Sequence, residues 1–429
     1  MILRLSTAAE RGAVAVIAVL CAAFLAFFSI RNAAASYFAS EQTLAGFNRA
    51  TRLEPSSAEN WFALGRYWQY NFENLDLDRA IAAYRKSLSI DPLSADTWLD
   101  LGAAYEALGD LPSARAAFLS AKRVYPVSAQ VAWSYGNFLL RQGELGAAFS
   151  EIHSAVAADP RRGAEAFSRC MRVDPDLDKI LDRVIPPSRD VYLDIIQGLA
   201  DDGQTTDALR VWNRLVAIRP RLQLRRASSL IEALRRKQLI PEASRVWQQA
   251  TSLSGFADLP HPPGSVLWDG GFESGETGLS YMWTFSPNAH GVQIRQDCQE
   301  KHSGSCSLRI SFDGQSNLNF SDVCHIVPIQ PSTTYNFSAW VHARALSTNQ
   351  GVHFVLRDLS QANSVATPDV QGSLDWRQIS AQWTAGPGLQ EAQVCLARSP
   401  SEQSDNKIRG TLWVDDVALV PASPGSPKP

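Results

Sequence analysis

The sequence predicts a multidomain chain: an N-terminal transmembrane helix, then an all-α solenoid of helical pairs, then an all-β sandwich. Three observations predict it. The run 12–30 is apolar and carries no charged residue, and a run of that length spans a bilayer as a helix. Between residues 56 and 160 apolar residues recur with helical period, and a proline closes each unit at 55, 92, 126 and 160. After residue 265 apolar and polar residues alternate, as they do in strands.

Composition is that of an ordinary globular chain. The protein has 429 residues, 45% of them hydrophobic and 19% charged, with a formal net charge of −3. A chain of this length holds two or three domains. The near-neutral charge argues against nucleic-acid binding, which needs a basic domain.

Residues 1–35 are interpreted as an N-terminal tail and a transmembrane anchor. Arg4 and Arg11 precede the apolar run, so the positive-inside rule leaves the N-terminus in the cytoplasm. The prediction is a single-pass protein of the cytoplasmic membrane with its bulk on the extracytoplasmic, periplasmic side. The alternative is a cleavable signal, because Ala33-Ala34-Ala35 offers a cleavage site. Both readings export the rest of the chain.

Residues 36–255 are predicted to form the solenoid, with 36–55 continuing the first helix outward. The best-defined unit has large apolar residues on one stripe of each helix, small residues at the crossing, and a closing proline: Trp98, Leu101, Gly102, Tyr105, Ala114, Phe118, Ala121 and Pro126. This spacing resembles the tetratricopeptide repeat, and the resemblance covers 56–160. Later pairs match less well. Such repeats need stacked neighbours and present a concave surface, so a protein partner is expected there.

A basic stretch lies near the end of the solenoid. Seven cations between Arg219 and Lys237 are opposed only by Glu232. They indicate either a patch for an anionic polymer or lipid headgroups, or the solvated face of the last helical pair.

A proline-rich linker at 256–265 ends the helical region, and a β-sandwich is predicted over 266–421. Tyr335, Phe337, Ala339 and Val341 alternate with polar neighbours, which assigns them to one buried face of a strand. Residues 422–429 are expected to be a disordered tail.

Motifs in this region resemble carbohydrate-binding modules of families 4 and 9, which are jelly-roll sandwiches of the galactose-binding-like type. The resemblance rests on an ordered series of short motifs: Asp269-Gly270-Gly271-Phe272-Glu273, Trp283, His302-Ser303-Gly304, Ser307-Leu308-Arg309-Ile310, the segment Pro331 to Val341, Trp376, and Trp413 to Val417. It implies the fold and, less specifically, sugar binding.

The sandwich holds four of the six cysteines, and an even set in an exported β domain predicts disulfides. Three pairings are possible. Cys298–Cys306, closing a short loop, with Cys324–Cys395 between strands is favoured, and buried free thiols are the alternative.

The family resemblance also implies a structural calcium ion as the one possible cofactor. Carried over, Glu273 and Asp416 would supply carboxylates, and backbone oxygens near Lys301 and Ser303 would complete the mixed oxygen shell that calcium prefers. The alternative is that both carboxylates pair with turn amides. No pair of histidines has zinc-ligand spacing.

A glycan site is predicted on the face opposite the buried set. Trp340 shares that face with Asn336, Ser338 and His342, and Arg357 and Gln382 are expected on adjoining strands. The glycan-binding candidates are therefore Trp340, Ser338, Arg357 and Gln382. Trp283, Trp376 and Trp413 occupy motif positions and are interpreted as core or structural. Trp340 has the same structural alternative.

No catalytic residues are predicted. The sequence contains no nucleophile-elbow, zinc-protease or phosphate-loop motif, and Asp415 and Asp416, adjacent on a strand, are expected to face opposite sides. The prediction is an exported adaptor in polysaccharide assembly or export. One alternative makes the sandwich a structural or protein-docking module, and another makes the chain an unrecognised glycan-processing enzyme.

Overall fold

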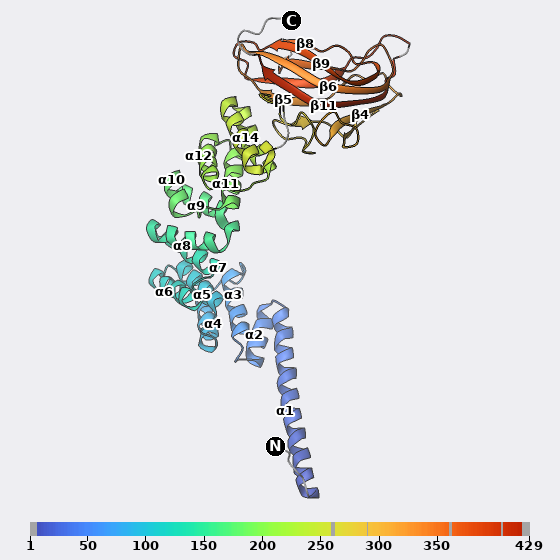
Figure 1. Cartoon of the computed structure of the whole chain (residues 1–429). Helices are drawn as coiled ribbons and strands as arrows, with labels where there is room; N and C mark the ends of the chain where they lie inside the picture. The colour runs from blue at the N-terminus through green and yellow to red at the C-terminus, as the bar shows by residue number, and fades with distance from the viewer. Residues whose placement is uncertain (1–6, 259–261, 290, 360–362, 405, 423–429) are drawn as a thin grey trace. The chain divides into compact units, whose positions relative to one another are not determined.

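The computed structural model describes residues 7–258, 262–289, 291–359, 363–404 and 406–422. The chain divides into two compact units, Met1–Pro186 and Pro187–Pro429, and Figure 1 labels helices and strands of both. The predicted order of an apolar helix, an array of helical pairs and a two-sheet β region is confirmed.

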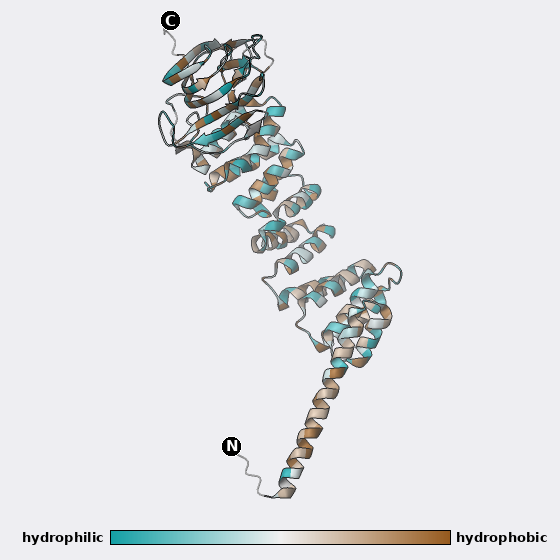
Figure 2. Cartoon of the chain, turned by 90° about the vertical axis from the view of Figure 1, so that its right-hand side faces the viewer, coloured by the Kyte–Doolittle hydropathy of each residue, from teal (hydrophilic) through white to brown (hydrophobic). Residues whose placement is uncertain are grey.

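The first unit begins with the long helix α1 (Ala8–Ser40). The stretch Arg11–Ser40 is long and apolar enough to cross a membrane, and its most apolar window is not buried against the protein; it is the brown helix of Figure 2. The helix does not continue to residue 55 as expected. Gln42 adopts a positive φ of 52°, and the Thr43 side chain caps a new helix, α2 (Leu44–Leu53), because a capping oxygen satisfies a free amide at a helix start.

Four helical pairs follow in this unit. Their bounds are α3 (Ala58–Tyr70), α4 (Leu77–Ile90), α5 (Ala95–Leu108), α6 (Leu111–Val124), α7 (Ala129–Arg141), α8 (Leu145–Ala158), α9 (Gly163–Val173) and α10 (Leu177–Arg183), with the 3₁₀ turn η1 (Pro160–Arg162) before α9. The first helix of each of the first three pairs starts with a serine cap, at Ser57, Ser94 and Ser128. The repeat in the sequence is therefore a repeat of helix starts as well as of apolar stripes.

Glycines set the spacing within these pairs. A Cβ on Gly65 would stand 2.6 Å from the ring of Tyr84, and one on Gly102 would stand 3.1 Å from the ring of Phe118. Phe118 is 2% exposed, but Trp98 is only half-buried at the end of its pair, with its indole N–H donating to the carbonyl oxygen of Pro92 at 3.0 Å. The motif tryptophan thus anchors the turn before α5 more than it fills the core.

The second unit starts with two further helical pairs. These are α11 (Arg189–Asp201), α12 (Thr205–Ala217), α13 (Ser228–Arg236) and α14 (Ile240–Ser254), with the 3₁₀ turns η2 (Leu224–Ala227) and η3 (Phe256–Asp258). Trp212 and Trp247 are buried in them. Part of the predicted linker, 259–261, and the tail residues 423–429 lie outside the described residues.

Two antiparallel sheets form the rest of this unit. One has the order β1-β5-β10-β7-β8 and the other β2-β3-β4-β11-β6-β9. The bounds are β1 (Trp283–Thr284), β2 (Asn288–Ala289), β3 (Val292–Asp297), β4 (Ser307–Asp313), β5 (Phe320–Pro328), β6 (Thr334–Leu346), β7 (His353–Asp358), β8 (Ser364–Ala366), β9 (Gly372–Thr384), β10 (Glu391–Arg398) and β11 (Arg409–Pro421). The predicted core residues Tyr335, Phe337, Ala339 and Val341 are at most 1% exposed.

The last helical pair packs directly on the sandwich. Arg235 of α13 donates to both carboxylate oxygens of Glu391 on β10, at 2.7 and 3.2 Å, and the Tyr281 hydroxyl donates to the same carboxylate at 2.9 Å. The Trp247 ring of α14 meets Tyr281 edge-on.

Within the basic stretch, Arg225 also pairs with Glu276. Part of that stretch is therefore an intramolecular contact, which neither reading of the sequence anticipated.

Candidate functional site

The outer face of the six-stranded sheet carries a group of rings, which we call the outer aromatic cluster: His302, Trp340, His342, Trp376 and Trp413. Strand pairing assembles it. His342 of β6 lies opposite Trp413 of β11, and β9, which carries Trp376, pairs with the other edge of β6. The ring centroids of His342 stand 5.0 Å from Trp413 and 5.7 Å from Trp376.

Trp413 is closed off inside this cluster. The guanidinium groups of Arg309 and Arg344 lie over its ring at 5.5 and 5.0 Å. Its indole N–H donates to the Asp297 carboxylate at 3.0 Å, and the residue is 4% exposed. Trp283 is buried in the core, with its N–H donating to the carbonyl of Asp269. Both tryptophans are therefore structural.

Trp340 and Trp376 are half-buried and keep part of their rings at the surface. Trp340 lies on the outer face as the alternation required, but the His302 imidazole stacks on it, with 3.8 Å between centroids and 14° between planes. Trp376 flanks the same imidazole at 5.7 Å. Trp376, interpreted from its motif position as core or structural, therefore also contributes to this surface. Its position on a strand with exposed polar neighbours is the signal that could have indicated this.

A row of uncharged side chains continues from these rings along β6 and β9; we call it the polar strip. It consists of Asn336, Ser338, Gln378, Ser380 and Gln382. Asn336 lies opposite Gln382 and Ser338 opposite Ser380, whereas Gln378 lies opposite Trp340. Gln382 donates to the Asn336 side-chain oxygen at 3.1 Å. Ser338 and Gln382 thus lie on the face of Trp340, as predicted.

The expectation for Arg357 is wrong. Arg357 lies on β7, which belongs to the other sheet, and its Nε donates to Gln393 of β10 at 3.0 Å. The reason is topological. β7 follows β6 along the chain but crosses to the opposite sheet, and alternation within a strand carries no information about which strands are neighbours.

A disulfide-closed loop covers the aromatic cluster. The structure contains Cys298–Cys306 around this loop and Cys324–Cys395 between opposed residues of β5 and β10, the pairing that the sequence favoured. The His302 and Ser303 amides donate to Asp415 at 2.8 and 3.0 Å. Burial raises the pKa of Asp415 to about 6, against the opposing effect of these hydrogen bonds.

The residues predicted to bind calcium all touch this loop. Glu273 accepts from the Ser305 amide at 2.7 Å, and Asp416 accepts from the Ser303 hydroxyl at 2.8 Å and contacts the His302 ring at 2.7 Å. The Lys301 ammonium donates to the Cys298 carbonyl. Across the described residues, no group of three or more His, Cys, Asp or Glu is arranged to hold a metal ion. These contacts match the turn-pairing alternative, and calcium binding stays a prediction.

Asp415 and Asp416 do not face opposite sides. The ladder of β11 is irregular between Asp415 and Ala418, and Asp416 has a positive φ of 47°. Both carboxylates therefore reach the same segment, His302–Ser303. An irregularity of this kind shifts side chains out of strict alternation.

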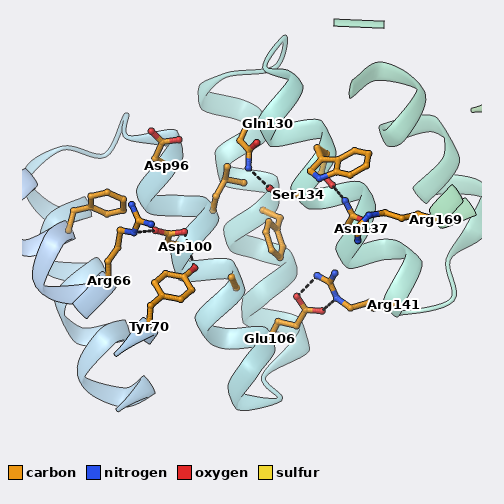
Figure 3. Close-up of a pocket in the computed structure, with 15 residues that line it drawn as sticks. Arg66, Tyr70, Asp96, Asp100, Glu106, Gln130, Ser134, Asn137, Arg141 and Arg169 are labelled. Atoms are coloured by element: carbon orange, nitrogen blue, oxygen red, sulfur yellow. Dashed lines mark hydrogen bonds and ion pairs between the residues drawn. The ribbon is translucent and has the colours of Figure 1, made fainter. Parts of the chain in front are cut away.

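A second candidate site is a cavity of about 490 Å³ in the first unit. It runs along α3, α5 and α7, the first helices of three successive pairs, and we call it the A-helix groove (Figure 3). Arg66 forms an ion pair with Asp100 at 3.5 Å, and Arg141 donates two hydrogen bonds to the Glu106 carboxylate, at 2.6 and 2.7 Å. Burial raises the pKa of Asp100.

Apolar side chains alternate with these charges in the groove. Phe62, Leu99, Phe118 and Trp133 contribute to its lining. Asn137 lies between Trp133, whose carbonyl accepts from its amide at 2.8 Å, and Arg169, which donates to its side-chain oxygen at 3.3 Å. Apolar side chains and paired charges therefore line the groove together. The sequence predicted this surface but none of these residues.

Comparison with known families identifies both regions. A model described as "Carbohydrate binding domain" matches residues 264–401, and one described as "Tetratricopeptide repeat" matches residues 72–133. Both resemblances are confirmed. The repeats indicate protein interaction and the sandwich indicates carbohydrate binding. No curated protein matches the sequence.

Several solved structures are similar to one part of the chain. YrrB, described as a TPR protein with an unusual peptide-binding site, is 15% identical, covering 50% of this chain and 94% of its own, with a TM-score of 0.26. PilF of Pseudomonas aeruginosa is 20% identical, covering 46% and 92%, with a TM-score of 0.27. TmCBM61, solved with β-1,4-galactotriose, is 16% identical, covering 37% and 99%, with a TM-score of 0.27.

Proposed function

We propose that the protein is a membrane-anchored, exported adaptor whose sandwich binds a glycan and whose solenoid binds a protein partner in polysaccharide assembly or export. The observation that supports glycan binding most directly is the half-exposed ring of Trp376, which lies at the head of the polar strip beside Trp340, the ring on which His302 stacks. It lies in the region matched by the carbohydrate binding domain.

The chemistry of the strip favours a neutral glycan. The C–H faces of sugar rings stack on aromatic rings, and their hydroxyls pair with amides and hydroxyls such as those of Gln378, Ser380 and Gln382. The strip contains no charged side chain, so an acidic polysaccharide would find no counter-ion in it. An open face of this kind buries little area, and we expect dissociation constants of roughly micromolar to millimolar, about −8 to −4 kcal/mol.

A glycan array probed with the detergent-solubilised full chain tests this proposal, followed by calorimetric titration of the best neutral ligand. Trp376→Ala and Gln382→Ala should each weaken binding at least tenfold, since they remove a platform and a hydrogen-bonding group. Arg357→Ala on the opposite sheet is the matched control and should bind as the parent chain does.

Other outcomes identify the alternatives. Unchanged affinity in Trp376→Ala and Trp340→Ala would move the glycan site away from this face. A chain that binds no glycan on the array would make the sandwich a docking module. Shortening of a bound glycan would identify a processing enzyme.

The anchor and the export belong to the same proposal. Two disulfides suit an oxidising compartment, and α1 offers the membrane span. The partner of the A-helix groove is to be found by pull-down from solubilised membranes. Trp133→Ala together with Asn137→Ala should release a partner that binds the groove, and one that is retained by this variant binds elsewhere.

A further inference from the structure

The contact between α1 and α2 determines which parts of the first unit lie level with the end of the apolar run. Height here means position along the axis of α1. A Cβ on Gly46 would stand 2.3 Å from the carbonyl oxygen of Phe38, so the two antiparallel helices touch backbone to backbone there. Each residue of a helix rises about 1.5 Å. Leu53 and Arg31 lie equally far from this contact, on their own helices, and therefore at the same height. Arg31 directly follows the last residue of the apolar run, Ile30.

The turn after α2, residues 54–57, is consequently level with the end of the apolar run. The next pair brings a second turn to the same height. The Ser87 hydroxyl donates to the Ala58 carbonyl at 2.8 Å, so the last turn of α4 lies beside the first residue of α3. The turn 91–94 then lies on the same side as 54–57, and we call the two turns together the membrane-side edge.

The chemistry of this edge suits a lipid headgroup layer. Leu93 is 74% exposed at its tip. Trp61 and Trp98 stand behind the two turns, with their indole N–H groups donating to Pro55 and Pro92, and tryptophan is enriched at membrane interfaces. Arg31, the first charged residue after the apolar run, lies at the same height, with its guanidinium 4.5 Å from the centre of the Phe28 ring.

We propose that the membrane-side edge lies in the headgroup layer of the outer leaflet, with Leu93 inserted among the lipids. This inference rests on the proposed anchor. It fixes the direction of the A-helix groove, because α3 and α5 then stand upright on the bilayer. The groove opens sideways, and the partner that enters it lies within about one helix length, 20 Å, of the membrane surface.

Site-directed fluorescence in liposomes tests the inference on the full chain. Cys21, in α1, is exposed and reacts with a thiol reagent. Cys170 is buried, so Cys21 is the one native target among the free cysteines of the described residues. Leu93→Cys is made in a Cys21→Ser chain and labelled with bimane. Phe72→Cys is the matched control, since Phe72 is fully exposed at the opposite end of α3, about 20 Å further from the bilayer.

Quenching by spin-labelled phosphatidylcholine in vesicles gives the result. With the nitroxide on the headgroup, label at 93 should be quenched at least threefold more than label at 72. Equal quenching at 93 and 72 would overturn the inference. Label on native Cys21 reports the anchor separately, with the nitroxide in the acyl chain. If Cys21 is not quenched, the anchor of the proposed function fails and the membrane-side edge fails with it. If Cys21 is quenched and 93 is not, only the edge is wrong.

Discussion

His325 is a titratable side chain in the core of the sandwich. It is 0% exposed on β5, and the Trp283 ring meets it edge-on at 5.2 Å. Burial disfavours the imidazolium and lowers the pKa of His325 to about 4. An unfolded chain protonates the same group near its ordinary value of about 6.5. The two states therefore bind different numbers of protons between these values.

The sandwich should consequently lose stability as pH falls from 6.5 towards 4. The unfolded state takes up the proton first in this window, so the free energy of unfolding decreases, by about 3 kcal/mol in total for this one group. Above pH 6.5 both states are neutral and His325 contributes no pH dependence. We expect His325→Leu to remove this acid loss, measured by denaturant unfolding at pH 7.5 and 4.5. Equal acid loss in the variant and the parent chain would show that other groups cause it.

At the scale of single residues, the sequence predicts well which face of a strand a side chain lies on. It predicts poorly which side chains from other segments contact it. Alternation placed Tyr335 in the core and Trp340 outside because a strand exposes its two faces in turn. It could not show that His302, from a distant loop, covers Trp340, or that Arg357 lies on the other sheet. Those facts depend on strand order and on loop packing, which are set by contacts between segments far apart in the chain.

The helical pair α5–α6 shows which motif residues stabilise a repeat. Phe118 is 2% exposed and packs on Gly102, so Phe118→Ala should destabilise the pair by about 3–5 kcal/mol, as aromatic truncations in cores do. Trp98 is half-buried, and Trp98→Ala should cost less, about 1–2 kcal/mol by area lost. Hydrogen exchange of α5 and α6 peptides in the full chain measures both. A larger loss of protection in Trp98→Ala than in Phe118→Ala would reverse this order.

Helix boundaries were predictable where local chemistry sets them. The serine caps and closing prolines recur with the repeat, and each acts within a few residues of its own position. The sequence did not predict the helix break at 41–43, because none of these three residues is a proline or a glycine. Only the packing of α2 back onto α1 makes that break visible.

At the scale of the molecule, the change in composition and the change in packing occur at different places. The sequence marks 256–265 as the point where helices give way to strands, whereas the chain separates into compact units at Pro186–Pro187. The difference arises because α13 and α14 bury surface against the sandwich. Arg235 and Glu391 keep only 15% and 8% of their side chains exposed, and Trp247 is 1% exposed.

We therefore expect the sandwich to be less stable alone than with the last helical pairs attached. A fragment 266–422 lacks α14 and uncovers Tyr281, and it leaves Glu391 without its buried cation. Its melting temperature should fall well below that of fragment 187–422, followed by near-ultraviolet circular dichroism. Coincident melting of the two fragments would show that the helical pairs add nothing to the sandwich.

The ion pair itself can be tested in the fragment 187–422. Removing one partner of a buried pair typically costs about 3–5 kcal/mol, so Arg235→Ala should unfold the fragment at distinctly lower urea concentration. Arg226 offers a matched control, since it pairs with Asp194 at 2.5 Å between the turn η2 and α11, and both side chains are at least 38% exposed. An exposed pair contributes about 1 kcal/mol or less. If Arg235→Ala and Arg226→Ala unfold alike, the contact between α13 and β10 does not hold helices and sandwich together, and the packing of Trp247 on Tyr281 must do so.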